Sequence, residues 1–227
     1  MTTIRLLNHG HVRLVDHMGS DLSVVRNARV SYDAEWRAGE DEGKDAKLID
    51  YLVKNKHTSP LEAVNFTFDV KAPIFVARQW MRHRTGKFSE ISARYAQLPD
   101  EFYDPELDQI TTQHTSNKQM RTDEQHPAAA MVRKMMYEHN VKSFELYKAM
   151  LKGGVPRELA RTILPLGTYT HFFYTVDLHN LMKFIQLRDH AHAQFEIRVY
   201  AQAMLGLIEP LVPVTVAAFR KHWLAQP

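Results

Sequence analysis

The chain contains no cysteine, so its fold must be held together without covalent cross-links between cysteines. This absence excludes disulfide bridges, thiolate zinc sites and a cysteine nucleophile. Hydrophobic residues make up 44% of the 227 residues, enough to bury a substantial core. The sequence therefore predicts a globular protein built around apolar packing, and it fits a reducing compartment.

The charge balance argues against general nucleic-acid binding. The formal net charge is +3, which is too small for the dense basic stripe typical of that class. The first residues, Met1 to Leu6, lack the apolar run of a signal peptide, and no stretch approaches the apolar length of a membrane span. We expect a soluble, cytoplasmic protein.

Hydrophobic periodicity predicts a mixture of helices and short strands. Phe66, Phe68 and Val70 alternate with polar residues, as in a half-buried strand, and Pro127 precedes a long helical pattern that ends at Gly153-Gly154. Further strands are expected at 12–15 and 168–176, and further helices at about 21–30, 48–53, 73–81, 157–164, 178–208 and 213–223. Residues 37–44 are expected to form a loop, and residues 109–125 a surface excursion. With no repeat or low-complexity linker, we expect one α+β domain over residues 1–227, mainly helical with a small antiparallel or mixed sheet.

The densest group of chemically active side chains lies between Arg82 and Arg94, directly after a predicted helix. Arginines placed in this way suit phosphate recognition, because the guanidinium fork matches two phosphate oxygens. A solvated basic loop at a helix end is the alternative, since cations are favoured there in any case. Charge alone does not decide between the two.

The spacing within this segment resembles the signature of the flavin-dependent thymidylate synthases, in which Arg-His-Arg is followed after seven residues by serine. Here Arg82-His83-Arg84 precedes Ser92 at that distance. The flanking residues 75–80 and 94–95, the block 156–166 and the block 187–196 are also similar to that family, in the same order. The resemblance extends from about residue 12 to the final helix.

The resemblance implies reductive methylation of dUMP to dTMP, with 5,10-methylenetetrahydrofolate as the carbon donor, FAD as the hydride carrier and NADPH as the reductant. The family works without a cysteine nucleophile, in agreement with the composition. The chain also lacks a P-loop and a glycine-rich dinucleotide motif, so side-chain cations would have to bind the phosphates. Family members are homotetramers with active sites shared between subunits, and we expect the same assembly here.

The resemblance also assigns residues to ligands. Arg188 corresponds to the family's catalytic arginine. The dUMP-binding set is Gln79, Trp80, Met81, Arg82, Glu90, Ile91, Ser92, Ala93, Arg94, Arg161 and Arg188. The FAD-binding set is His57, Ser59, Arg82, His83, Arg84, Glu90, Asp177, His179 and Lys183.

Several positions depart from the family pattern. Leu61 and Ala63 replace a phenylalanine and a histidine of the loop that lies near the flavin. Asp177, His179 and Lys183 stand where relatives often carry Asn, Arg and a later Asn or His. Because a carboxylate next to a phosphate is unfavourable, Asp177 is expected to act through its backbone or on a ribose hydroxyl.

Two other classes of protein remain as alternatives. The same arginines and aromatic residues could serve a non-catalytic nucleotide-binding or nucleic-acid-binding protein. His190, His192 and Glu196 could form the centre of a metal-dependent hydrolase, with His192 and Glu196 on one helical face, but the spacing separates the two histidines and no metal is expected. Ser92 lacks a recognisable base beside it, so it is interpreted as a dUMP contact and not as a nucleophile.

Overall fold

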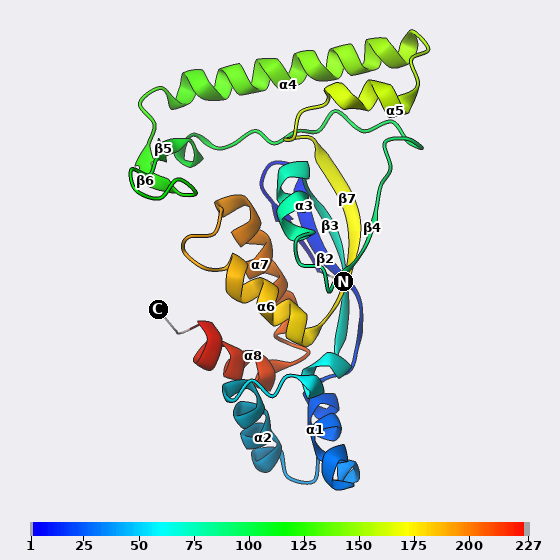
Figure 1. Ribbon diagram of the computed structural model, residues 1–227, viewed down its shortest axis with the longest axis vertical. Helices are drawn as coiled ribbons and strands as arrows, with labels where there is room; N and C mark the ends of the chain where they lie inside the picture. The colour runs from blue at the N-terminus through cyan, green and yellow to red at the C-terminus, as the bar shows by residue number, and fades with distance from the viewer. Residues whose placement is uncertain (1, 225–227) are drawn as a thin grey trace.

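Two long antiparallel strands, β3 (Asn65–Pro73) and β7 (Tyr169–Asp177), lie side by side at the centre of the computed structural model, which describes residues 2–224 (Figure 1). β2 (Gly10–Met18) and β1 (Thr3–Leu6) extend the sheet beyond β3, and β4 (Lys87–Glu90) extends it beyond β7. The order is β1-β2-β3-β7-β4, and each neighbouring pair is antiparallel. The predicted small sheet is therefore confirmed as antiparallel.

One face of this sheet forms the main core. The alternating side chains of β3, Phe66, Phe68 and Val70, are at most 1% exposed. They pack beneath α3 (Ile74–Trp80), α6 (Leu178–Arg188) and α7 (Phe195–Ile208), which cover that side of the sheet (Figure 1). Burying such aromatic and aliphatic side chains stabilises the fold by about 1.5–3 kcal/mol each. The opposite face carries polar side chains, including Asp69 and His171.

The remaining helices lie at the two ends of the sheet (Figure 1). One end carries α1 (Asp21–Arg29), α2 (Glu42–Lys54), α8 (Pro213–Phe219) and the π-helical turn η6 (Arg220–Leu224). The other end carries α4 (Ala129–Lys152), α5 (Arg157–Ala160) and the hairpin of β5 (Thr111–Gln113) and β6 (Arg121–Gln125). Short 3-10 turns connect these elements: η1 (Val30–Tyr32), η2 (Glu35–Arg37), η3 (Ser59–Ala63), η4 (Leu107–Gln109) and η5 (Arg161–Ile163).

The architecture is a single α+β domain with eight α-helices within residues 2–224, so the predicted fold class is confirmed. None of the helices in the described part of the chain is long and apolar enough to cross a membrane. The boundaries 1–227 of the predicted domain include Met1 and residues 225–227, which lie outside the described residues.

Three local expectations need correction. The expected loop at 37–44 ends earlier, because α2 begins at Glu42 with Asp41 as its N-cap. The expected excursion at 109–125 contains the β5–β6 hairpin. The expected helical stretch at 178–208 consists of α6 and α7 with a break at 189–194.

Candidate functional site

Arg188, the predicted catalytic residue, is the last residue of α6 and points toward the end of α3. Its Nε donates a hydrogen bond to His83 Nε2 at 3.1 Å, and its Nη2 donates to the backbone oxygen of Gln79 at 3.4 Å. All three residues are partly buried. Arg188 is therefore brought against two predicted site residues, Gln79 and His83, that lie more than 100 residues earlier in the sequence.

Aromatic packing fixes this arrangement. Phe184 of α6 stacks on Trp80 of α3 with ring centroids 4.7 Å apart, and the His83 ring lies edge-on to Phe184 at 4.9 Å. Such aromatic pairs add roughly 0.5–1.5 kcal/mol each beyond the burial of their area. Trp80 as a whole residue is 0% exposed, so neither its side chain nor its backbone presents surface to a ligand in this structure.

His83 is electrostatically unusual. Burial lowers the pKa of its imidazole, the nearby charges of Arg188 and Lys183 lower it further, and the pKa falls to about 4. Burial also lowers the pKa of the Arg188 guanidinium. A neutral imidazole at physiological pH leaves Nε2 free to accept the hydrogen bond from Arg188.

The segment that follows His83 crosses closely over Tyr174. A Cβ atom on Gly86 would lie 2.1 Å from the Tyr174 ring, so only glycine allows this approach. Arg82 and Arg84 project from the same segment and are exposed. Within residues 2–224 neither arginine forms an ion pair, which leaves both guanidinium groups available to a ligand.

A second group of predicted residues lies on β4 and just after it. The Thr170 hydroxyl donates to the Glu90 carboxylate at 2.5 Å, and the Ile91 N–H donates to the His171 backbone oxygen at 2.9 Å. Ser92 Oγ accepts the N–H of Arg94 at 3.3 Å. Glu90, Ile91, Ala93 and Arg161 line one cavity of about 190 Å³.

The side chains around Ser92 do not form a nucleophile site. Its hydroxyl makes no hydrogen bond to a histidine or a carboxylate in the part of the chain that the structure describes. Arg94 instead forms an ion pair with Glu158 of α5 at 3.4 Å, which holds the segment after β4 close to Arg161. The arrangement favours binding of an anion over nucleophilic attack by the serine.

A third group contains the remaining residues predicted to bind FAD. His57 and Ser59 precede and begin η3, and both are exposed. His179 Nδ1 lies 3.5 Å from Glu62 of η3, so the start of α6 is held beside this turn. Lys183 is exposed one turn further along α6 and lies close enough to His83 to lower its pKa.

Asp177 has a structural role at this position. Its carboxylate is the N-cap of α6, where it accepts hydrogen bonds from the backbone N–H of Asn180 at 2.9 Å and from its Nδ2 at 2.7 Å. An N-cap carboxylate satisfies helix N–H groups that would otherwise lack partners. Each oxygen of Asp177 therefore already accepts one hydrogen bond, and the contact of Asp177 with a ligand through its backbone or a ribose hydroxyl stays a prediction.

The sequence did not point to the cavity beside the β5–β6 hairpin. This cavity of about 550 Å³ is lined by Arg121, His192, Gln194 and Arg198, among others. Gln194 hydrogen-bonds to Gln79, which connects the cavity to the Arg188 group. The polarity of residues 109–125 was attributed to solvent exposure, and no local pattern indicates that they form a wall of a cavity.

His192 and Glu196 do not share a helical face as predicted, because His192 lies before the start of α7. His190 and His192 lie in the break between α6 and α7, and both are exposed. Glu196 is 2% exposed and bonded to Tyr103 at 2.9 Å and Arg121 at 3.2 Å. The carboxylate thus joins α7 to the hairpin, and the geometry does not support a metal-dependent hydrolase built on these residues.

The three groups have cationic side chains in common, and such side chains can bind anionic, phosphate-bearing ligands. In the first group a half-buried arginine stands beside a neutral histidine, and the adjacent segment carries exposed arginines that have no ion pair within the described chain. In the described residues no hydrogen bond or ion pair joins the Arg188 group to the group around Ser92.

Comparison with known proteins assigns the family. The family model described as thymidylate synthase complementing protein (Thy1) matches residues 13–214. A flavin-dependent thymidylate synthase from Thermus thermophilus is 48% identical, over 98% of this chain and 80% of that protein. One from Ehrlichia ruminantium is 46% identical, over 97% of this chain and 73% of that protein. The chain belongs to the flavin-dependent thymidylate synthase family.

The fold is also similar to that of a solved structure. A UMP/dUMP methylase, PolB, from Streptomyces cacaoi bound with 5-Br dUMP is 36% identical, with a TM-score of 0.87. The match covers 99% of this chain and 100% of that chain. The recognition made from the Arg-His-Arg signature and the later blocks is therefore confirmed.

Proposed function

We propose that this flavin-dependent thymidylate synthase converts dUMP to dTMP with 5,10-methylenetetrahydrofolate as the carbon donor and NADPH as the reductant. FAD is its flavin and carries the hydride. The chain contains no cysteine, so a thiolate of the enzyme cannot attack the pyrimidine. Another group must polarise the uracil ring.

The observation that carries this proposal is the position of Arg188. His83 and the Gln79 carbonyl hold Nε and Nη2, while Nη1 makes no hydrogen bond to any of residues 2–224. The guanidinium is therefore oriented by the protein and still has donors for a ligand. A preorganised cation of this kind stabilises negative charge that develops on a bound ring, and one such donor contributes about 2.7–4 kcal/mol.

The residues present suit a flavin dinucleotide. Arg82 and Arg84 supply exposed guanidinium groups, without an ion-pair partner among residues 2–224, for a diphosphate, and Lys183 adds a cation from α6. His179 and the turn containing His57 and Ser59 lie at the start of the same helix. When bound, the flavin supplies the redox chemistry, and the protein contributes binding, orientation and charge.

The second group would bind the nucleotide phosphate. Arg94 and Arg161 provide two cations beside Ser92, whose hydroxyl and neighbouring backbone can donate hydrogen bonds. Glu90 is held by Thr170 and lines the same cavity. Gln79 and Arg82 of the first group complete the proposed dUMP set.

We further propose a homotetramer with shared active sites. Among the described residues no hydrogen bond or ion pair links the Arg188 group to the Ser92 group, and in this proposal one copy supplies the first group and a second copy the other. Sedimentation or light scattering measures the assembly. Complementation between an Arg188 variant and an Arg161 variant, each inactive alone, would support sharing, and no recovery on mixing would contradict it.

The visible spectrum of the purified protein tests the flavin and its reductant. The expected result is flavin absorbance near one per chain, bleached by NADPH without oxygen, followed by dTMP formation when dUMP and the folate are added. A colourless protein that binds RNA in a salt-dependent manner would contradict the proposal and favour a nucleic-acid-binding role.

A further inference from the structure

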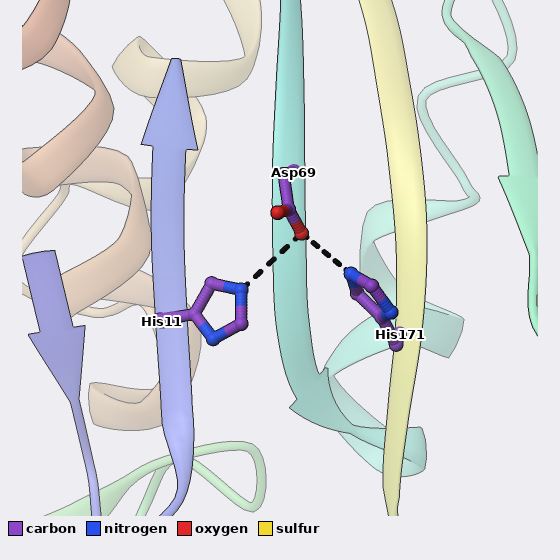
Figure 2. Close-up of side chains that lie close together, drawn as sticks. All are labelled: His11, Asp69 and His171. Atoms are coloured by element: carbon purple, nitrogen blue, oxygen red, sulfur yellow. Dashed lines mark hydrogen bonds and ion pairs between the residues drawn. The ribbon is translucent and has the colours of Figure 1, made fainter. Parts of the chain in front are cut away.

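Three side chains converge on the outer face of the sheet, away from α6 and α7. His11 comes from β2, Asp69 from β3 and His171 from β7, and Figure 2 shows both imidazoles directed at the same carboxylate oxygen. His11 Nε2 lies 3.2 Å from Asp69 Oδ1, and His171 Nε2 lies 2.5 Å from it. The three candidate ligand atoms all lie within 4.8 Å of one another.

The strand register produces this convergence. His11 and His171 are both opposite Lys71, one on each side of β3, so the two imidazoles flank the central strand. Asp69 lies two residues before Lys71 on the same face, and its short side chain reaches between them. The Lys71 ammonium forms an ion pair with Glu101, so its charge is compensated by a different partner.

Arg13 orients the carboxylate. Its Nη2 lies 2.6 Å from Asp69 Oδ2, the oxygen that does not face the histidines, and the Asp69 side chain is only 7% exposed. Burial alone would raise the pKa of Asp69, but hydrogen bonds from His171, Arg13 and His11 outweigh it and lower the pKa. Arg13 thus occupies Oδ2 and leaves Oδ1 directed at the two histidines.

We propose that His11, Asp69 and His171 form a binding site for a divalent transition metal ion of the zinc type. Two imidazole nitrogens and one carboxylate oxygen are preferred donors for Zn²⁺ and its neighbours. His11 and His171 are 26% and 46% exposed at the side chain, which leaves further coordination positions open to water. Arg13 holds the second carboxylate oxygen, as outer partners of ligating carboxylates do.

The position of the site determines its effect. The site joins three neighbouring strands on the face opposite the core that contains Trp80 and Phe184. A metal that binds the folded chain shifts the unfolding equilibrium toward it. The expected consequence is thermal stabilisation, separate from the chemistry proposed around Arg188.

Titration calorimetry of the full chain with Zn²⁺ alone tests the proposal, with Co²⁺ absorption as an independent report of imidazole coordination. The informative variants are His11→Ala and His171→Ala, because both side chains are partly exposed and their loss leaves the core intact. His17→Ala is the matched control, since His17 is an exposed histidine of the same strand. His192→Ala tests whether Zn²⁺ binds instead at the exposed pair His190 and His192, whose rings are 4.8 Å apart.

The expected result is one Zn²⁺ per chain, a melting temperature that rises with Zn²⁺, and an affinity reduced at least about 10-fold in each ligand variant. Both control variants should bind as the unmodified protein does. Absence of stoichiometric binding would overturn the proposal and leave the cluster as an ion-pair network around Asp69. Equal affinity in His11→Ala and His171→Ala, or loss of binding in His192→Ala, would overturn it as well.

Discussion

Arg188 donates from Nε to Nε2 of His83 across 105 residues of sequence, at 3.1 Å. A protonated imidazole cannot accept this hydrogen bond, so the contact requires the neutral form. Burial, followed by the charges of Arg188 and Lys183, lowers the pKa of His83 to about 4 and keeps the ring neutral. Burial first, and the charge of the arginine second, thus favour the neutral form of the residue that orients the arginine.

This contact predicts how stability depends on pH. An unfolded histidine titrates near pH 6.5, whereas folded His83 titrates near 4. Between these values the unfolded chain binds more protons, so the free energy of unfolding falls as the pH falls from about 6.5 to 4. In His83→Gln the free energy of unfolding should fall less over this pH range than in the unmodified protein. The difference should be roughly 1–2 kcal/mol, after allowance for solvent screening.

Urea unfolding at several pH values measures this difference. His17→Gln, which replaces an exposed histidine, serves as the control and should keep the slope of the unmodified protein. Because the carboxylates titrate in all three proteins, only the difference between variants reports on His83. An identical slope in His83→Gln would show that its ring is not held neutral.

Arg84→Ala should weaken FAD binding more than dUMP binding. The side chain is exposed, without an ion-pair partner among residues 2–224, and lies in the segment proposed to bind the flavin diphosphate. Loss of a charge-assisted hydrogen bond costs about 1.5–3 kcal/mol. Flavin retention and dUMP affinity are measured in parallel, with Arg220→Ala, which removes a surface ion pair with Glu209, as the control. Equal flavin retention in the Arg84 and Arg220 variants would contradict the assignment.

Ser92→Ala should retain measurable dTMP formation, with a weakened affinity for dUMP. The Ser92 hydroxyl accepts only the N–H of Arg94 in the described structure and has no base beside it. A positioning serine is expected to lose one hydrogen bond to the substrate, worth about 0.5–1.5 kcal/mol. Mass spectrometry of the turning-over enzyme provides the second measurement. Detection of a covalent nucleotide adduct on Ser92 would disprove the positioning role.

The sequence predicted elements that are defined by local patterns. The helix between Pro127 and Gly153 has a strong start and stop signal, and the alternation in β3 directly marks its buried face. β4 was missed because Lys87–Glu90 is short and polar, and it is a strand only because β7 pairs with it. The break at 189–194 was missed because the buried Glu196 is fixed by Tyr103 and Arg121, which are distant in sequence.

In the candidate site, too, the sequence revealed local motifs but not the contacts between distant segments. The Arg-His-Arg segment and the later blocks could be recognised by spacing, but nothing in their local pattern places Arg188 against His83. That contact depends on Phe184 stacking on Trp80, a tertiary event between α6 and α3. The cluster of His11, Asp69 and His171 was invisible for the same reason, since three strands supply one residue each.

The sharpest prediction concerns Arg188→Lys. A surface ion pair would tolerate lysine, because such pairs contribute little. Arg188 instead uses Nε for His83 and Nη2 for the Gln79 carbonyl while Nη1 remains available, a division that a single ammonium cannot reproduce. We expect the variant to fold, bind FAD and accept electrons from NADPH, and to form dTMP roughly two orders of magnitude more slowly.

Anaerobic flavin reduction and dTMP production, measured on the same preparation, separate these effects. Arg220→Lys is the matched control, since Arg220 forms a surface ion pair with Glu209 at 3.0 Å, and it should keep full turnover. Slow dTMP formation with normal flavin reduction places the defect after the reductive step, where charge develops on the uracil. Near-normal dTMP formation in Arg188→Lys would remove Arg188 from the catalytic role, and loss of flavin reduction as well would assign it to cofactor binding.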